Sequence, residues 1–199
     1  MPRLGRAFFE ASTPKVAWAL LGSRLVRVES GRRMSGKIVE AEAYRGEDDP
    51  ASHAFRGVTG RNRVMFGEGG HAYIYLSYGS NWCLNVTTEP EGTPGAVLIR
   101  AIEPVEGLDA MLRNRGRDRG AHLTDGPGRL TQALEIDLRL NGEDLVTSGR
   151  LFLEEGGSPK NWKSGPRVGV SRGVDLKWRF FDSDSKFVSR ARTTPPQNP

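Results

Sequence analysis

The sequence contains little cysteine and no long apolar run, and both shortages exclude whole classes of protein. Cys83 is the only cysteine among 199 residues, so neither an intramolecular disulfide nor a zinc site with several thiolates can form. The longest apolar run, Val16–Gly22, is far too short to span a bilayer, and the N-terminus lacks a signal-peptide profile. We therefore expect a soluble, cytoplasmic protein with no membrane partner.

Histidine is also scarce, and the motifs of several common cofactor sites are missing. His53, His71 and His122 are the only histidines, and no two of them have the spacing of metal ligands on a helix or a hairpin. The sequence has no P-loop, no dinucleotide-binding fingerprint and no recognisable serine nucleophile. We expect neither a metal ion nor a cofactor.

What the sequence does contain is typical of one globular domain with a basic surface. Hydrophobic residues make up 37% of the chain and charged residues 27%, and the 25 glycines and 12 prolines indicate many turns. The formal net charge is +5 and the pI is about 9.6. This charge favours a polyanionic partner, nucleic acid ahead of a membrane surface, although many basic proteins bind no polyanion.

The order of the predicted elements indicates an α+β fold. Helices are predicted for Ala11–Gly22, Pro104–Gly116 and Gly126–Leu134, and strands for Ser23–Glu29, Lys37–Tyr44, Ala96–Pro104, Arg167–Ser171 and Trp178–Asp182. A polar turn is expected at 30–36, a long loop at 45–70 and a hairpin at 71–86. We expect one compact domain, residues 3–190, with a curved, mainly antiparallel sheet, short flanking helices and a protruding hairpin. Residues 191–199 are predicted to form a flexible tail.

The strand Lys37–Tyr44 has an unusual distribution of charge. With a period of two, one face holds Val39, Ala41 and Ala43, and the other, expected to be exposed, holds Ile38, Glu40, Glu42 and Tyr44. Neighbouring carboxylates repel each other, so at least one should bind its proton more tightly unless a cation lies between them. A carboxylate that accepts a proton near neutrality can act as a general base. The alternative is that both carboxylates pair with surface arginines.

Tyrosine is concentrated in two places. Tyr44 ends the acidic strand, and the predicted hairpin holds Tyr73, Tyr75 and Tyr78. Phenol rings beside basic loops can stack on nucleic-acid bases, whereas tyrosines on strands more often serve as half-buried packing. Arginines at positions 56, 61, 63, 113, 115, 117 and 119 place positive charge on two loops, as phosphate contacts would require. A solvated surface explains each of these arginines almost as well.

Long strings along the chain point to a family. They include "GKIVEAEAYRGEDDPASHAFRG", "RNRVMFGEGGHAYIYLSYGSNWCLNV" and "AVLIRAIEPVEGLDAM", and they continue with "DGPGRLTQAL" and "RVGVS". In order and spacing, these strings resemble the alkyladenine (3-methyladenine) DNA glycosylases of the eukaryotic type over nearly the whole chain. The missing N-terminal extension makes the chain similar to a bacterial member, which would act in the cytoplasm at the nucleoid.

The resemblance implies a monofunctional enzyme that starts base excision repair. Such enzymes flip alkylated or deaminated purines out of double-stranded DNA and hydrolyse the N-glycosidic bond with an activated water. By the family pattern, Glu42 is the general base and Arg100 helps to hold the water. The base pocket would be lined by Tyr44, His53, Tyr75, Asn85 and Leu98, with Asn85 as a steric gate against the exocyclic amino group of guanine.

The resemblance also assigns DNA contacts outside the pocket. Tyr78, at the hairpin tip, would fill the gap that the flipped base leaves in the stack, and Arg61 and Arg63 would contact the DNA backbone. Ser80 stands where the eukaryotic pattern has a methionine. Glu40 is expected either to tune Glu42 or to anchor the strand, and the protein is expected to act as a monomer.

Two other functions compete with this one. A non-catalytic damaged-DNA-binding module would need Glu42, Arg100 or the pocket tyrosines to be replaced, and none is. A carbohydrate hydrolase could use Glu40 and Glu42 as its acid pair. It is disfavoured because such enzymes place their two carboxylates on opposite sides of the scissile bond, whereas these two come from one strand.

Overall fold

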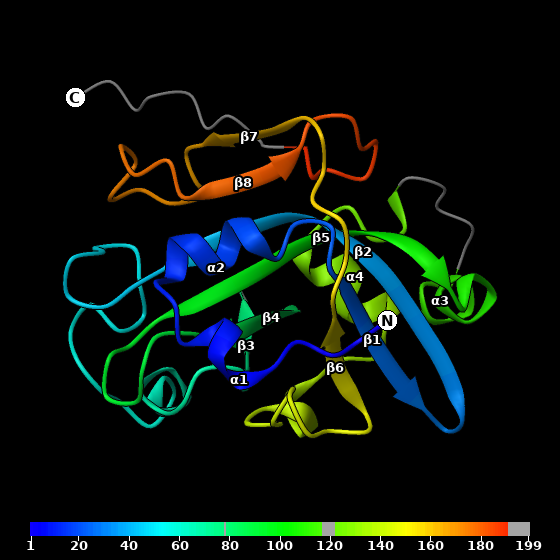
Figure 1. Cartoon of the computed structure of the whole chain (residues 1–199), viewed down its shortest axis with the longest axis horizontal. Coiled ribbons are helices and arrows are strands. Elements are labelled where there is room, and N and C mark those ends of the chain that lie inside the picture. Colours follow the sequence, from blue (N-terminus) through cyan, green and yellow to red (C-terminus); the bar gives the residue numbers. More distant parts are fainter. Residues whose placement is uncertain (78, 117–121, 191–199) are drawn as a thin grey trace.

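The fold is organised around one sheet of eight strands. The structure, a computed structural model, describes residues 1–77, 79–116 and 122–190 (Figure 1). The strands are β1 (Arg24–Glu29), β2 (Arg32–Tyr44), β3 (Ala72–Ser77), β4 (Asn81–Thr87), β5 (Ala96–Glu106), β6 (Leu151–Glu154), β7 (Trp162–Gly165) and β8 (Arg179–Asp182). They are ordered β3-β4-β5-β2-β1-β6, β8 joins β2 to β7, and all pairings between them are antiparallel. The predicted α+β class with a curved, mainly antiparallel sheet is confirmed.

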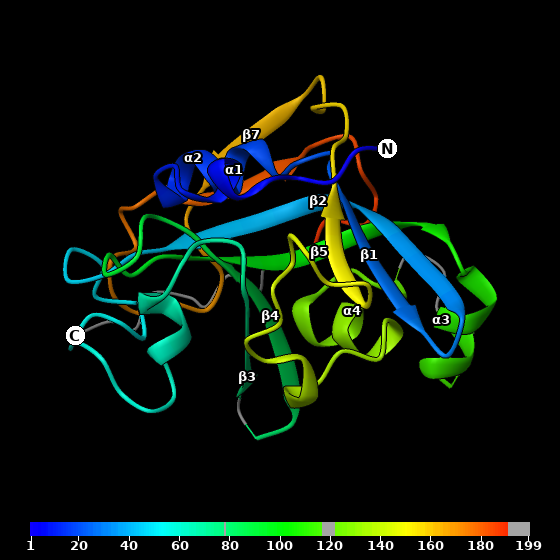
Figure 2. The ribbon, with the colours of Figure 1, turned by 60° about the horizontal axis from the view of Figure 1, so that its bottom comes forward.

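Short helices cover both sides of the long β2–β5 pair. They are α1 (Arg6–Phe9), α2 (Thr13–Ala19), α3 (Leu108–Asn114) and α4 (Pro127–Ala133), with 3₁₀ turns η1 (Arg63–Phe66) and η3 (Leu138–Leu140). In Figure 2, α1 and α2 lie on one side of β2 and β5, and α3 and α4 lie on the other. No helix in the described part of the chain is long and apolar enough to cross a membrane.

β2 connects the separate parts of the sheet. One edge of its 13 residues pairs with β5, and the other edge pairs first with β1 and then, at Glu40–Glu42, with β8. The register with β5 shifts between Ile38 and Ala41, which indicates a β-bulge. The bulge breaks the predicted alternation, because Ile38 joins Ala41 and Ala43 in the main hydrophobic core, whereas Val39 is buried outside it.

The predicted exposure of the acidic face of β2 is wrong. Glu40 and Glu42 are both 0% exposed. β8 pairs with β2 beside them, and the backbone N–H of Ser189 donates a hydrogen bond to Glu40. This cover could not be read from the local pattern, because Ser189 comes 149 positions after Glu40 in the chain.

Two other predictions fail for local reasons. The polar turn at 30–36 is only two residues long, because Ser30 and Gly31 have φ values of 50° and 73°, the left-handed backbone of a tight hairpin loop. β2 therefore begins at Arg32. The strand predicted at Arg167–Ser171 consists of turns and bends, with Gly169 at a φ of 76°.

The hairpin and the three predicted helices are found where the sequence placed them, although the helices are shorter. β3 and β4 pair from Ala72 and Val86 to Ser77 and Asn81, and their joined end projects at the lower edge of Figure 2. The sequence patterns do not predict α1, η1, η3, β6 or β7. Tyr78 and the predicted tail 191–199 lie outside the described residues.

Candidate active site

A cavity of about 690 Å³ opens between the β3–β4 hairpin, the middle of the sheet and the N-terminal end of α4. Side chains from β2, β3, β4 and β5 line it, together with residues from the loop 51–65 and the turn 168–170. Its lining includes Tyr44, His53, Tyr75, Asn85, Leu98 and Arg100. These six residues, predicted as site residues, therefore lie around one space large enough for a small organic ring system.

Glu42 lies directly behind the cavity wall and is held by three donors. Its Oε1 accepts a hydrogen bond from the backbone N–H of Val168 at 2.7 Å. Its Oε2 accepts one from the Tyr44 hydroxyl at 2.9 Å and one from Nη1 of Arg100 at 3.2 Å. All three donors belong to residues that line the cavity. A carboxylate offers about four acceptor positions, so the second position of Oε1 remains for one more donor.

The environment of Glu42 makes it a stronger base than an exposed glutamate. Burial raises the pKa of Glu42, and the charge of Glu40 adds to this rise. Arg100, the Val168 N–H and the Tyr44 hydroxyl act in the opposite direction without cancelling the effect of burial. The result is a carboxylate that takes up a proton more readily than usual while remaining hydrogen-bonded on both oxygens.

A buried ion pair packs against the ring of Tyr44. The guanidinium carbon of Arg167 lies 4.6 Å from the centre of the Tyr44 ring. Arg167 pairs with Asp49 at 2.6 and 2.7 Å, and both side chains are fully buried. Burial and the charge of Glu42 raise the pKa of Tyr44 well above its ordinary value, so its hydroxyl keeps its proton and donates to Glu42.

His53, Tyr73 and Tyr75 form an aromatic wall of the cavity. The His53 ring meets the Tyr75 ring edge-on at 4.6 Å between centres, and its Nδ1 lies 2.8 Å from the Tyr73 hydroxyl. Burial, with a contribution from Arg61, lowers the pKa of His53, so the ring is neutral at neutral pH. Burial raises the pKa of Tyr73 to about 12, which keeps that phenol protonated.

Two residues that face each other on β4 and β5 line the cavity. Asn85 and Leu98 face each other in the antiparallel register and both line the cavity. The Asn85 amide donates to the backbone oxygen of Tyr73 at 3.0 Å, which fixes the orientation of its side chain. Cys83, on the same strand, also lines the cavity, and burial raises the pKa of its thiol, so it does not supply a thiolate at neutral pH.

The remaining predicted residues differ in their relation to the cavity. Arg61 lines it, with its guanidinium carbon 5.1 Å from the centre of the Tyr75 ring. Arg63 is exposed on η1 and is not part of the lining. Tyr78 lies outside the described residues, so its role stays a prediction. In the described ranges, no three His, Cys, Asp or Glu side chains are grouped as metal ligands would be.

The sequence analysis missed Val168 and the Arg167–Asp49 pair. Val168 donates its backbone N–H to Glu42. Every residue except proline has such a group, so the sequence alone does not mark this contact. The string "RVGVS", which contains Arg167 and Val168, is predicted as a strand, whereas in the structure it contains the turn whose Val168 N–H contacts Glu42.

Comparison with known sequences gives a family for this arrangement. The sequence profile described as methylpurine-DNA glycosylase (MPG) matches residues 7–186. The chain belongs to this family. A relative from Prosthecochloris aestuarii is 49% identical over 98% of this chain and 95% of its own length, and one from Methanocella arvoryzae is 48% identical over 96% and 97%. Both relatives carry the name "Putative 3-methyladenine DNA glycosylase".

The MPG match confirms the family predicted from the sequence strings. The matched range contains Glu42, Arg100 and every residue that lines the cavity. It ends at residue 186, before Ser189, which contacts Glu40. The MPG family assignment therefore covers the whole cavity but not the C-terminal residues packed behind it.

Proposed function

We propose that this MPG-family protein is a monofunctional DNA glycosylase that removes damaged purines, of the 3-methyladenine type, from double-stranded DNA. The observation that carries the proposal is a buried, hydrogen-bonded glutamate with a raised pKa behind an aromatic cavity of about 690 Å³. The names of the relatives support the same class of substrate. Because the cavity is concave, the base would have to leave the duplex stack to enter it.

The cavity has the features that an extruded purine requires. Tyr44, and His53 in contact with Tyr75, line the cavity and offer aromatic surfaces on which a purine ring can stack. Stacking of this kind contributes about 1–3 kcal/mol per base and accepts many ring substituents. Asn85, fixed by its bond to the Tyr73 backbone, would exclude bases that carry an amino group at its position.

Hydrolysis would use Glu42 as the general base. A water bound at the remaining acceptor position of Oε1 gives its proton to Glu42 as its oxygen bonds to C1′ of the sugar. The N-glycosidic bond breaks, and its electron pair leaves with the damaged base. The carboxylate also stabilises the positive charge that develops on the sugar. Arg100, which donates to Oε2, would orient Glu42 and help to hold the water.

The lack of a lysine in the described lining of the cavity supports release of the base without strand cleavage. Cleavage through a Schiff base needs a lysine nucleophile. Lys37, on the same strand as Glu42, is partly exposed and pairs with Glu103 at 2.9 Å and with Asp182 at 3.6 Å. Within the described residues, the lining of the cavity contains no lysine. We therefore expect borohydride to trap no covalent adduct between the protein and DNA.

One assay separates this function from its alternatives. The protein is incubated with a duplex that carries a single alkylated or deaminated purine, and the product is tested for alkali-labile abasic sites. We expect abasic sites only in the damaged strand, with an otherwise identical undamaged duplex as the control. A damaged-DNA-binding module would bind this duplex and leave it intact. Strand cleavage without alkali would contradict the monofunctional mechanism.

A further inference from the structure

Behind Glu42 lies a second buried carboxylate, that of Glu40, which accepts four hydrogen bonds from protein groups. Its Oε1 accepts hydrogen bonds from Nε of Arg100 at 2.9 Å, Nε of Arg179 at 2.7 Å and the Ser189 hydroxyl at 2.9 Å. Its Oε2 accepts one from the backbone N–H of Ser189 at 2.7 Å. Glu40 is fully buried and does not line the cavity. It therefore acts through its neighbours and not on the substrate.

These contacts hold the Arg100 guanidinium on three sides. Nε donates to Glu40, Nη1 donates to Glu42 at 3.2 Å, and Nη2 donates to the Ser189 hydroxyl at 3.2 Å. The Ser189 hydroxyl thus accepts from Arg100 and donates to Glu40, which makes it a bridge between them. A planar guanidinium held at two edges has a fixed third edge, so Glu40 and Ser189 determine where Nη1 points.

We propose that Glu40 and Ser189 are positioning residues. They orient Arg100 toward Glu42, and the positive charge of Arg100 is shared between the carboxylates of Glu40 and Glu42. The inference rests on the proposed function for its kinetic test only. It assigns a role to Ser189, which lies beyond the range that the family profile matches. Ser189 then contributes to the catalytic centre, although it does not line the cavity.

Sharing the charge of Arg100 between Glu40 and Glu42 affects the pKa of Glu42 in a predictable direction. The charged and titratable groups around Glu42 are Glu40 and Tyr44 on β2, Arg100 on β5, Cys83 on β4, Arg179 on β8 and Arg167 before the 168–170 turn. If Glu40 becomes neutral, its repulsion is lost and Arg100 and Arg179 act on Glu42 alone. All these changes favour ionised Glu42, so its pKa falls and it becomes a weaker base.

The kinetic test uses Glu40→Gln in the full chain. Single-turnover excision is followed across pH with a duplex carrying one alkylated purine. We expect the acidic limb of the profile to move down by about 1 pH unit and the plateau rate to fall by about tenfold, with binding of the damaged duplex unchanged. The matched control is Glu103→Gln, which removes the same charge from a partly exposed site on β5. A slower rate with an unmoved limb would indicate a purely structural role and overturn the inference.

A second measurement does not depend on catalysis. The titration of the Glu42 carboxyl carbon is followed by ¹³C NMR, with its signal assigned by its loss in Glu42→Gln. We expect a lower midpoint in Glu40→Gln than in the wild type, and an equal or higher midpoint would contradict the sharing of charge. If the wild type excises no base, the proposed function fails while this comparison still decides the inference.

Ser189 provides a test that leaves the buried charges intact. Ser189→Ala removes the bridging hydroxyl, and we expect the single-turnover rate to fall about tenfold to a hundredfold because Arg100 is no longer fixed. Ser189→Thr keeps a hydroxyl and should restore most of the rate. Duplex binding should be the same in both variants. A wild-type rate in Ser189→Ala, or equal losses in both variants, would overturn the inference even if Glu40→Gln fails to fold.

Discussion

At the scale of single residues, the chemistry of the site comes from the surroundings of Glu42. Burial raises its pKa, and three hydrogen-bond donors keep the ionised form available inside the protein. A glutamate in water, with its ordinary pKa, would be a weaker base. The protein therefore gains basicity from burial and limits the cost of that burial with Arg100.

Replacing the proposed base should abolish most of the activity without preventing binding. Glu42→Gln keeps the length of the side chain, but it replaces one acceptor oxygen with an NH2 donor and cannot take the proton of water. We expect excision to fall about 10²–10⁴-fold, as is typical when a general base is lost. Gel-shift binding of a damaged duplex should be retained. If Glu40→Gln lost more activity than Glu42→Gln, the two acids would have been assigned the wrong roles.

Tyr44→Phe should move the acidic limb of the pH profile of excision in the opposite direction from Glu40→Gln. This hydroxyl donates to Glu42 at 2.9 Å and lowers the pKa of Glu42. In Tyr44→Phe that hydrogen bond is lost, so the pKa of Glu42 rises further. Because Glu42 must be ionised to act, the acidic limb should move up by about 0.5–1 pH unit, the equivalent of one hydrogen bond.

Tyr75→Phe is the matched control for this experiment. Tyr75 also lines the cavity, but its phenol contacts Cys83 and not Glu42. It should therefore leave the position of the acidic limb unchanged, whatever it does to the rate. If the acidic limb moved by the same amount in both variants, its position would depend on stacking of the base and not on ionisation of Glu42.

Sequence reasoning identified the residues of this site better than it identified their environment. The spacing of Glu40 and Glu42 pointed to a possible base, but the prediction of an exposed face was wrong. Arg179 and Ser189, which contact Glu40, lie far along the chain. The sequence around residue 40 gives no sign of these contacts. Val168 could not be found either, because it contributes only its backbone.

At the scale of elements, the position of the β3–β4 hairpin against α4 shapes the cavity. Gly128, in the first turn of α4, packs so closely on β4 that an added Cβ would lie 2.6 Å from Oδ1 and 2.7 Å from Cβ of Asn81. Both residues line the cavity. The close contact sets the distance between the helix and the end of the hairpin that begins at Asn81.

Gly128→Ala should therefore move the hairpin and widen or distort the cavity. Overpacking of this kind costs about 1–3 kcal/mol, which thermal or urea unfolding would measure, and excision should fall along with stability. Gly149→Ala is the control, because its added Cβ would meet no atom within 4 Å. Unchanged stability and activity in Gly128→Ala would mean that Asn81 adapts without moving the hairpin.

The elements that sequence patterns revealed are those whose signals are local. The β3–β4 hairpin has alternating side chains around a turn, and α2 has Pro14 in its first turn after Ser12. β7 was missed because it lies at the margin of the sheet, largely exposed, and has no alternation to detect. Its place is determined only by pairing with β8.

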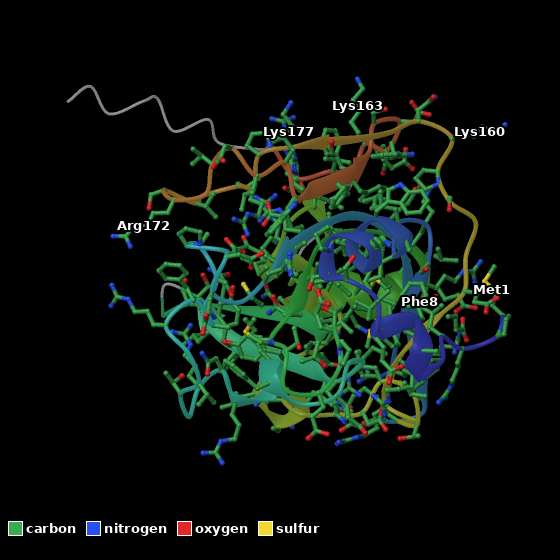
Figure 3. All side chains as sticks on the ribbon, turned by 60° about the vertical axis from the view of Figure 1, so that its left-hand side comes forward. Met1, Phe8, Lys160, Lys163, Arg172 and Lys177 are labelled. Atoms are coloured by element: carbon green, nitrogen blue, oxygen red, sulfur yellow. The ribbon has the colours of Figure 1, made fainter. Side chains whose placement is uncertain are left out.

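At the scale of the whole molecule, positive charge is distributed unevenly with respect to the cavity. Arg61 lies at the cavity, over Tyr75, and Arg63 lies nearby on η1. Figure 2 shows β7 on the opposite side of the molecule from the β3–β4 hairpin, and Figure 3 shows Lys160 and Lys163 pointing outward there. The net charge of +5 alone therefore does not say which surface would meet DNA.

Salt titrations can identify that surface. We expect Arg63→Ala to weaken binding of damaged and undamaged duplexes by the same factor, and to reduce the slope of log K against log salt by about 0.9, as for one phosphate contact. Lys163→Ala, at the far end of the molecule, removes the same charge and should leave the slope unchanged. Equal effects of the two variants would mean that binding responds to total charge and not to a defined surface.

The Glu40–Ser189 contact has a consequence for the synthesis of the protein. Glu40 and Glu42 are made early, whereas Ser189 follows Glu40 by 149 positions. At about 5–20 residues per second, roughly 7–30 s separate the two on the ribosome. During this interval Glu40 and Arg100 lack a partner that the finished enzyme supplies. A nascent or prematurely terminated chain therefore has no fully assembled catalytic centre, so incomplete copies of the protein should not create abasic sites efficiently.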